Sequence, residues 1–325
     1  MSKVERPENN RFVKGELREE LPTEMVEAFL RLGIEKEKIR FLGLMRNRTY
    51  RVEVAGDEGT KSFVYKEISA EHGRTIIDII QDQNASRILE QLGYPARKLL
   101  VLEPNINPKC AIFNLIPGER GGVNQNELLI PERVLLIAKD LRSTHQATET
   151  DFYNQSTVAI PEKDSEVSYQ DFCIGYAIND IGRLDIPNRE QISALIKESA
   201  GHLARGKFSF IHGDINQFNI VWKNPERPIL IDWGYSEFGD FTRDIANLLL
   251  HLHKDRRGDF EAVLASILQQ YGDRSEQINR NLKFYLGLRY LTYGRVGLVR
   301  AGDPTALKKI EQGYSLLKEF IEEST

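Results

Sequence analysis

The chain has 325 residues, of which 41% are hydrophobic and 28% are charged, so it is neither a disordered nor a fibrous protein and is long enough for two lobes. Its 44 basic and 48 acidic residues give a formal net charge of −4, which argues against nucleic acid as the main partner. Two cysteines, Cys110 and Cys173, cannot build a disulfide framework, so we expect a reducing, cytoplasmic location. We expect no membrane partner, because no run of about 18 apolar residues and no signal peptide are visible.

The first part of the chain is predicted to be rich in strands. Apolar residues at helical spacing predict a first helix over 24–33, which Gly33 ends. Residues 76–92 are predicted to form an amphipathic helix with Ile77, Ile80, Ile88 and Leu92 on one side. Apolar runs predict four strands, over 41–54, 61–68, 98–103 and 110–115. A turn-rich loop over 55–60 joins the first two of them.

After the linker Ile116-Pro117-Gly118, helical patterns dominate. A strand-rich island over 208–234 interrupts them, with two apolar runs at 219–222 and 228–233. The sequence therefore predicts an α+β fold with a sheet-rich N-terminal lobe, residues 1–115, and a mostly helical C-terminal lobe, residues 116–325. The predicted helices of the second lobe are 132–145, 169–182, 189–205, 240–254, 259–271, 277–301 and 304–322.

The island contains the residues with the clearest chemical signature: His212-Gly213-Asp214, then Asn219, then Asp232. Phosphoryl transfer needs a carboxylate near the attacking hydroxyl and metal ions that neutralise the phosphates. Asp214 can supply the carboxylate, while Asn219 and Asp232 offer the oxygen ligands that Mg²⁺ prefers. An Asp followed five residues later by Asn, and then by an Asp at the end of an apolar run, has the spacing of a kinase catalytic loop.

The segments FIHGDINQFNIVW and ILIDWGYSEFGDFTRDIANL resemble the aminoglycoside phosphotransferase and choline kinase superfamily, small-molecule kinases with a bilobal, protein-kinase-like fold. The resemblance covers most of the chain. GLMRNRTYRV is similar to the family's phosphate-covering hairpin, FVYKEI to the strand that carries the nucleotide lysine, and AIFNLIPGE to the hinge. The segment RNLKFYLGLRYLTYGRVGLVRAGD is loosely similar to hygromycin B phosphotransferases.

The resemblance implies a role for several residues. Asp214 matches the catalytic aspartate and His212 the histidine that supports its loop. Lys66 matches the lysine that pairs with the α- and β-phosphates of ATP or GTP, although a solvated strand lysine is the alternative. The carbonyl of Asn114 and the N–H of Ile116 would bind the base.

Two departures from the family pattern affect the nucleotide site. The helix over 76–92 has no central Glu, so we expect Asp82 to pair with Lys66, with ordinary surface charge as an equal alternative. The loop Gly43–Thr49 has one glycine instead of several. We expect Asn47 to present its amide to phosphate there, and a plain hairpin end is the alternative.

The segment 146–185 suggests the acceptor, because its eight acids and two bases give a local charge of −6. Such a segment would attract a cation, so we expect an acceptor with amines, such as an aminoglycoside or amino-alcohol, contacted by Asp171 and Asp180. A solvated acidic insert, about 146–187, is the alternative. Asp240 and Asp244 are interpreted as loop anchors and helix caps.

The sequence thus predicts a kinase that uses Mg²⁺ and ATP or GTP to phosphorylate a hydroxyl of a small, polar and cationic acceptor. Three alternatives stay open: a catalytically weak, nucleotide-binding regulator of the same fold, a kinase of a neutral sugar, and a kinase of protein side chains.

Overall fold

The computed structural model describes residues 23–46, 49–57, 59–68, 76–103, 109–121, 126–146, 174, 188–204, 206, 208–301 and 303–325. Asn47, Asp171, Cys173 and Asp180, most of the acidic segment and most of the helix predicted over 169–182 lie outside these ranges. The chain divides into two compact units, one made of Met1–Gln125 with Ile231–Gly234 and the other of Asn126–Leu230 with Tyr235–Thr325. The segment that carries Asp232 therefore belongs to the first unit.

The first unit is built on an antiparallel sheet of five strands in the order β1-β2-β3-β5-β4. The stretch predicted as one strand over 41–54 is in fact two antiparallel strands, in which Arg46 of the first pairs with Thr49 of the second. The strands are β1 (Ile39–Arg46), β2 (Thr49–Gly56), β3 (Gly59–Ile68), β4 (Leu99–Glu103) and β5 (Lys109–Asn114), and a short β6 (Glu119–Arg120) follows.

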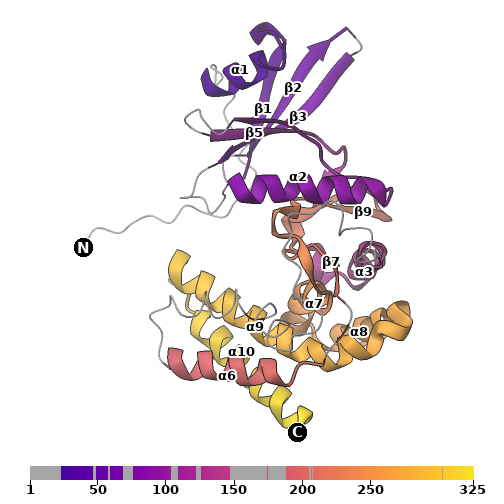
Figure 1. The fold of residues 1–325 in the computed structure, drawn as a ribbon, viewed down its shortest axis with the longest axis vertical. Coiled ribbons are helices and arrows are strands. Elements are labelled where there is room, and N and C mark those ends of the chain that lie inside the picture. Colours follow the sequence, from indigo (N-terminus) through magenta and orange to yellow (C-terminus); the bar gives the residue numbers. More distant parts are fainter. Residues whose placement is uncertain are drawn as a thin grey trace, which may run out of the picture. The chain divides into compact units, whose positions relative to one another are not determined.

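Each face of this sheet packs against one helix, α1 (Thr23–Leu30) or α2 (Ile76–Gln91), as Figure 1 shows. Met25 and Phe29 of α1 pack with Val52 and Tyr65 on one face. The other face forms a second core that includes Ile79 of α2. Successive strand residues point to opposite faces, so Lys66 is on the α2 side of the sheet, next to Tyr65 on the α1 side.

The buried face of α2 differs from the apolar side predicted from the sequence. Ile77 is 71% exposed, and Ile80 and Leu92 are also exposed. The buried residues follow helical spacing around a polar position, and they are Ile79, Asp82, Ala85, Ser86, Ile88 and Leu89. The prediction failed because it assumed that the buried face is apolar, whereas Asp82 lies at its centre.

The second unit is mostly helical, as predicted. The described α-helices of this unit are α3 (Pro131–His145), α6 (Arg189–Gly201), α7 (Thr242–Asp255), α8 (Arg257–Tyr271), α9 (Ser275–Ala301) and α10 (Ala306–Ser324). Single 3₁₀ turns are η1 (Lys36–Lys38) in the first unit and η3 (Glu127–Leu129), η4 (Gln217–Asn219) and η6 (Gly272–Arg274) in the second. The turn η5 (Trp233–Tyr235) lies where the chain passes between the units. In the part of the chain that the structure describes, no helix combines the length and the apolar character needed to traverse a bilayer.

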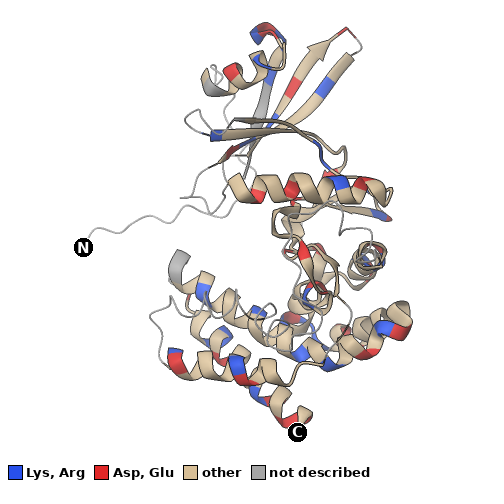
Figure 2. Cartoon of the chain, viewed as in Figure 1, with Lys and Arg blue, Asp and Glu red and all other residues tan. Residues whose placement is uncertain are grey.

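Helices α9 and α10 lie side by side and form much of the second unit (Figure 1). Their backbones approach closely at Gly287 and Gly313, where a Cβ added to Gly313 would lie 2.7 Å from the Gly287 carbonyl oxygen. Charged residues of both signs lie on α6, α8 and α10 (Figure 2).

Two short strand pairs of the second unit position the predicted catalytic loop. Strand β7 (Phe208–Ile211) pairs with β10 (Glu237–Asp240), and β8 (Ile220–Asn224) forms a hairpin with β9 (Arg227–Leu230). The loop runs from the end of β7 to the start of β8. The predicted helix over 240–254 begins two residues later, at Thr242, because Asp240 still belongs to β10. The structure thus confirms the mixed fold with a sheet-rich first part and a helical second part.

Candidate active site

The loop that contains Asp214 begins with a glycine that no other residue could replace without rearrangement. Gly213 has φ +79°, and a Cβ there would lie 2.2 Å from the carbonyl oxygen of Tyr235. A side chain would thus meet both a disfavoured backbone conformation and a rigid neighbour. The close approach of Gly213 to Tyr235 fixes the position of the next residue, Asp214.

The carboxylate of Asp214 is held by neutral amides at one of its two oxygens. Its Oδ2 accepts hydrogen bonds from Asn216 Nδ2 at 3.0 Å and Asn219 Nδ2 at 3.1 Å. Asn219 Nδ2 also donates to the Asp214 carbonyl at 3.0 Å, and Asn216 Oδ1 accepts from the N–H of Phe218. Because the amide nitrogen of Asn219 is committed to Asp214, its amide oxygen is the atom left to act as a ligand.

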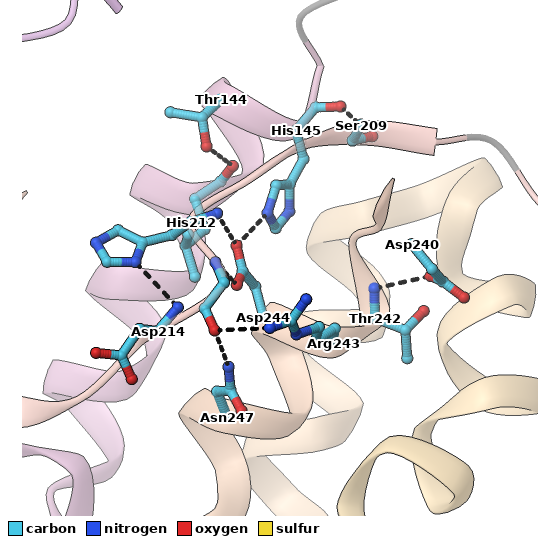
Figure 3. Close-up of polar contacts among 12 residues, drawn as sticks. Thr144, His145, Ser209, His212, Asp214, Asp240, Thr242, Arg243, Asp244 and Asn247 are labelled. Atoms are coloured by element: carbon cyan, nitrogen blue, oxygen red, sulfur yellow. Dashed lines mark hydrogen bonds and ion pairs between the residues drawn. The ribbon is translucent and has the colours of Figure 1, made fainter. Parts of the chain in front are cut away.

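A single carboxylate, Asp244 of α7, anchors the start of the loop, as Figure 3 shows. Its Oδ2 accepts the N–H of His212 at 2.7 Å, and its Oδ1 accepts the N–H of Gly213 at 2.9 Å. The buried His212 ring then accepts the N–H of Asp214 at Nδ1, at 3.3 Å. His212 therefore supports the loop through its backbone and its ring.

Asp244 is fully buried and receives a third hydrogen bond, from His145 Nε2 of α3 at 3.1 Å. A carboxylate can only accept, so His145 carries a proton on Nε2, and its Nδ1 forms a hydrogen bond with the Tyr271 hydroxyl at 2.8 Å. Burial by itself raises the pKa of Asp244, but the hydrogen bonds from His145 and the His212 backbone outweigh it, so the pKa is lower than usual. Burial raises the pKa of Tyr271 well above its usual value, which keeps its hydroxyl a donor.

Arg274, in η6, holds the chain around this cluster. Its guanidinium donates to the His145 carbonyl at 2.5 Å and to Ser209 Oγ at 2.7 Å, and it lies over the Phe241 ring. Asp240 accepts the N–H of Thr242 at 2.9 Å, which caps the start of α7. The structure thus places Asp244 as a loop anchor and Asp240 as a cap.

The first unit contains a separate cluster of four charged side chains around Lys66. Lys66 Nζ lies 2.8 Å from Asp232 Oδ1 and 4.0 Å from Asp82 Oδ2. Arg97 Nη2 lies 3.4 Å from Asp82 Oδ2 and 3.5 Å from Asp232 Oδ1. The ion pair expected between Lys66 and Asp82 is therefore present, but Arg97 is the closer cation to Asp82.

Asp82 also fixes the backbone next to Asp232. Its Oδ1 accepts the N–H of Trp233 at 3.0 Å, and Asp232 itself has φ +69°, a conformation that non-glycine residues rarely adopt. The ring of Phe113 lies under both cations, 5.1 Å from Lys66 Nζ and 5.2 Å from the guanidinium carbon of Arg97. Two cations and two carboxylates thus make a cluster with no net charge.

The two residues predicted to bind the nucleotide base lie at and after the end of β5. Asn114 is the last residue of this strand, and its side-chain oxygen accepts the N–H of Lys98 at 2.5 Å. Its own N–H donates to the Lys98 carbonyl at 3.1 Å. Ile116 is buried two residues further on. The side chain of Asn114 therefore stabilises the sheet edge.

Sequence reasoning missed two arginines that contact predicted site residues. Arg97 precedes β4 in a segment without any motif, so no pattern distinguished it from a surface arginine. Arg289 lies in α9, where regularly spaced leucine and aromatic residues are typical of core packing and single out no functional residue. Its Nη2 is 3.5 Å from Asp214 Oδ1.

The oxygen atoms of Asn219 and Asp232 fit the chemistry of Mg²⁺, which takes oxygen ligands and usually keeps only one or two from the protein when phosphates supply the rest. Among the described residues there is no cluster of three or more His, Cys, Asp or Glu side chains that would hold a metal ion by itself. Each of these two oxygens, one in either unit, therefore suits a metal whose other ligands are phosphate oxygens.

Comparison with known proteins identifies the class of this fold. Residues 39–281 match the model of the Phosphotransferase enzyme family. No curated protein sequence matches the chain. Similar solved structures include a Ralstonia eutropha protein provisionally named an aminoglycoside phosphotransferase (14% identity, 94% of this chain and 98% of that one, TM-score 0.63) and the choline kinase LicA of Streptococcus pneumoniae with AMP (15%, 91% and 98%, 0.61). Another is a thermostable aminoglycoside phosphotransferase mutant with ADP and hygromycin B (13%, 91% and 98%, 0.54).

These matches define a protein-kinase-like phosphotransferase. The chain belongs to the Phosphotransferase enzyme family, as the resemblance of its catalytic-loop segment implies. Membership of this family makes the chain a phosphotransferase, and the solved structures, which are 13–15% identical to it, share its protein-kinase-like fold.

Proposed function

We propose that this protein transfers the γ-phosphoryl group of ATP or GTP to a hydroxyl of a small polar acceptor, with Mg²⁺, in the cytoplasm. The observation that carries the proposal is the anchored loop, in which buried Asp244 holds the backbone before Asp214 and two amides hold its carboxylate. Such positioning is what phosphoryl transfer requires of a protein.

Asp214 orients the acceptor. Because Oδ2 is occupied by Asn216 and Asn219, the acceptor hydroxyl binds at Oδ1. The hydroxyl oxygen forms a bond to the γ-phosphorus while the bond from that phosphorus to the β,γ-bridging oxygen breaks, and the hydroxyl proton passes to Asp214 Oδ1. Nucleoside diphosphate and the phosphorylated acceptor are the products.

The remaining residues bind the nucleotide. Lys66 exchanges its contact with Asp232 for the α- and β-phosphate oxygens, and Arg97 then stays as the cation beside Asp82. Asn219 and Asp232 would hold Mg²⁺, which when bound would supply positive charge to the phosphate oxygens. Backbone groups of Asn114 and Ile116 bind the base, and Asn47 covers the phosphates.

The acceptor is proposed to bear amines. The charge of −6 in the segment 146–185 supports this, with Asp171 and Asp180 as contacts, and the names of two similar proteins refer to aminoglycoside and choline acceptors.

The test is the variant D214N, assayed for nucleotide consumption with a panel of aminoglycosides and amino-alcohols. We expect kcat to fall by about 10³-fold or more, while nucleotide still raises the melting temperature. The matched control is N224D in the exposed β8–β9 turn. Normal kcat in D214N would refute the proposal, and so would a wild-type protein that binds nucleotide but phosphorylates no acceptor, the result expected of a regulator.

A further inference from the structure

Arg289, near the middle of α9, reaches the catalytic loop from the second unit's own helices. Its Nη2 lies 3.5 Å from Asp214 Oδ1, its guanidinium carbon lies 5.1 Å from the centre of the Tyr293 ring, and its side chain is 20% exposed. The ring and the carboxylate hold the guanidinium beside Asp214. A desolvated cation next to a catalytic carboxylate needs an explanation beyond helix packing.

Most of the hydrogen-bonding capacity of Arg289 is unused. A guanidinium has five N–H donors in a fixed fork. The one hydrogen bond that it makes, to Asp214, is at the long limit of the range, and its buried Nε has no partner among the described residues. A buried donor without a partner is costly, so a ligand that satisfies it gains affinity.

The geometry of Asp214 decides what such a ligand would be. Its Oδ2 is occupied by two amides, so the reacting hydroxyl binds at Oδ1, and Oδ1 is also the oxygen that Arg289 faces. The group on the carbon next to that hydroxyl would therefore lie against the guanidinium. An amine in this place would be repelled, whereas an anionic group would be bound.

A histidine packs against the tyrosine on which the guanidinium lies. His251 packs edge-on against Tyr293, and its Nδ1 accepts from Asn126 Nδ2 at 3.2 Å. Burial lowers the pKa of His251 to about 4, with Lys254 contributing, so the ring is neutral near pH 7. Among the described residues, Asp214 is the only carboxylate that forms an ion pair with Arg289.

We propose that Arg289 selects an acceptor in which an anionic group, a carboxylate or a phosphate, is attached next to the reacting hydroxyl. The planar fork binds two oxygens of that group in parallel. This inference rests on the proposed function and refines it, because an amine bound by the acidic segment must then be remote from the reacting hydroxyl.

The experiment uses four three-carbon alcohols that differ only in the group beside the hydroxyl. They are glycerol, 3-amino-1,2-propanediol, glycerate and glycerol 3-phosphate, each assayed with the full-length protein, Mg²⁺ and ATP. We expect the highest kcat/KM for one of the two anionic alcohols, and the better one tells carboxylate from phosphate. The variant R289M should lower kcat/KM for that alcohol by about 10- to 100-fold, mainly through KM, and should lower kcat/KM for glycerol by a clearly smaller factor.

R289K, which keeps the charge but loses the fork, should show an intermediate loss. It also keeps the test decisive if R289M fails to fold. The matched control is R280M on the same helix, because Arg280 is exposed and pairs only with Glu276. This variant should match the wild type with all four alcohols.

The inference is wrong if glycerol or the aminodiol is the better acceptor, if neither anionic alcohol is phosphorylated, or if R289M lowers kcat equally for every acceptor. The last result would mean that Arg289 only positions Asp214. If glycerol or the aminodiol is the better acceptor, the proposed function stands, since phosphoryl transfer still occurs. That function fails separately if nucleotide is not consumed with these alcohols or with any aminoglycoside or amino-alcohol.

Discussion

The two buried polar clusters of this protein balance charge in different ways. In the first unit, Lys66 and Arg97 face Asp82 and Asp232, so cations compensate carboxylates. In the second unit, Asp244 is completely buried but receives two backbone N–H groups and one imidazole N–H. One cluster therefore consists of ion pairs, and the other of directed hydrogen bonds to a single anion.

This difference suits what each cluster has to do. Ion pairs are exchangeable, and Lys66 can leave Asp232 for phosphate oxygens while Arg97 remains beside Asp82. Hydrogen bonds from backbone amides are directional, so Asp244 fixes the geometry of His212 and Gly213 without moving. We infer that charge substitutions act mainly on nucleotide binding in the first cluster, and on stability and loop geometry in the second.

The largest effect is expected from D244N. Asparagine has the same shape, but one of the two carboxylate oxygens becomes an NH₂ group, which is a donor. In one orientation this NH₂ faces the N–H of His212 and Nε2 of His145, and in the other it faces the N–H of Gly213, so a donor faces a donor in both cases. We expect a loss of about 2 to 4 kcal/mol in the free energy of unfolding and a fall in kcat of more than tenfold. Urea unfolding and steady-state kinetics measure both.

D259N on the surface of α8 serves as the control, because Asp259 forms only an exposed pair with Arg256. Its stability should stay within about 0.5 kcal/mol of the wild type. If D244N is as stable and active as this control, the anchor role of Asp244 is refuted, and the contrast between the two clusters disappears.

The sequence predicts the loop residues better than their partners. Asp214, Asn219 and Asp232 follow a spacing that the chemistry requires, and Asp82 follows from the position of a helix after Lys66. Arg97 could not be found in this way, because its side chain enters the cluster from a segment without periodicity. The Tyr271–His145–Asp244 chain depends on tertiary packing between helices that are far apart in sequence.

The fold shows the same limit. Strand and helix positions follow from apolar runs, but no glycine or proline stands between the end of β1 at Arg46 and the start of β2 at Thr49, so two strands were predicted as one. For α2, apolar residues alone indicated the wrong buried face, because that face is organised around Asp82. A charged residue, Asp82, therefore stands where packing rules predict a hydrophobic residue.

A smaller effect is expected from R97M, which removes the guanidinium that lies near both Asp82 and Asp232 and leaves Lys66 beside them. The cluster would then carry one uncompensated negative charge, although Asp232 remains partly exposed to water. We expect a loss of about 2 to 3 kcal/mol in stability and weaker nucleotide binding, because Lys66 would be retained by the carboxylates. Calorimetric titration with the nucleotide measures the second effect.

A double-mutant cycle makes this test specific to the ion pairs. In R97M/D82N the cluster is again neutral, so the two stability losses should sum to more than the loss in the double variant. R87M, at an exposed position of α2, is the matched control. If the losses of R97M and D82N add without coupling, the first cluster is not held by ion pairs.

The smallest effect is expected at His251, and it tests whether burial in the second unit keeps this ring uncharged, as it does for the hydroxyl of Tyr271. The pKa of His251 is lowered to about 4 by burial, from 6.5 for an unperturbed histidine. Between these values the unfolded chain binds a proton that the folded chain does not, so stability is complete above pH 6.5 and decreases as the pH falls toward 4. The free energy of unfolding should fall by about 1 to 3 kcal/mol over this pH range because of His251, and the value is kept low because water reaches part of the ring. In H251Q, which keeps an acceptor for Asn126, the unfolding free energy should depend less on pH between 6.5 and 4, and an unchanged slope would show that His251 is not held neutral by its surroundings.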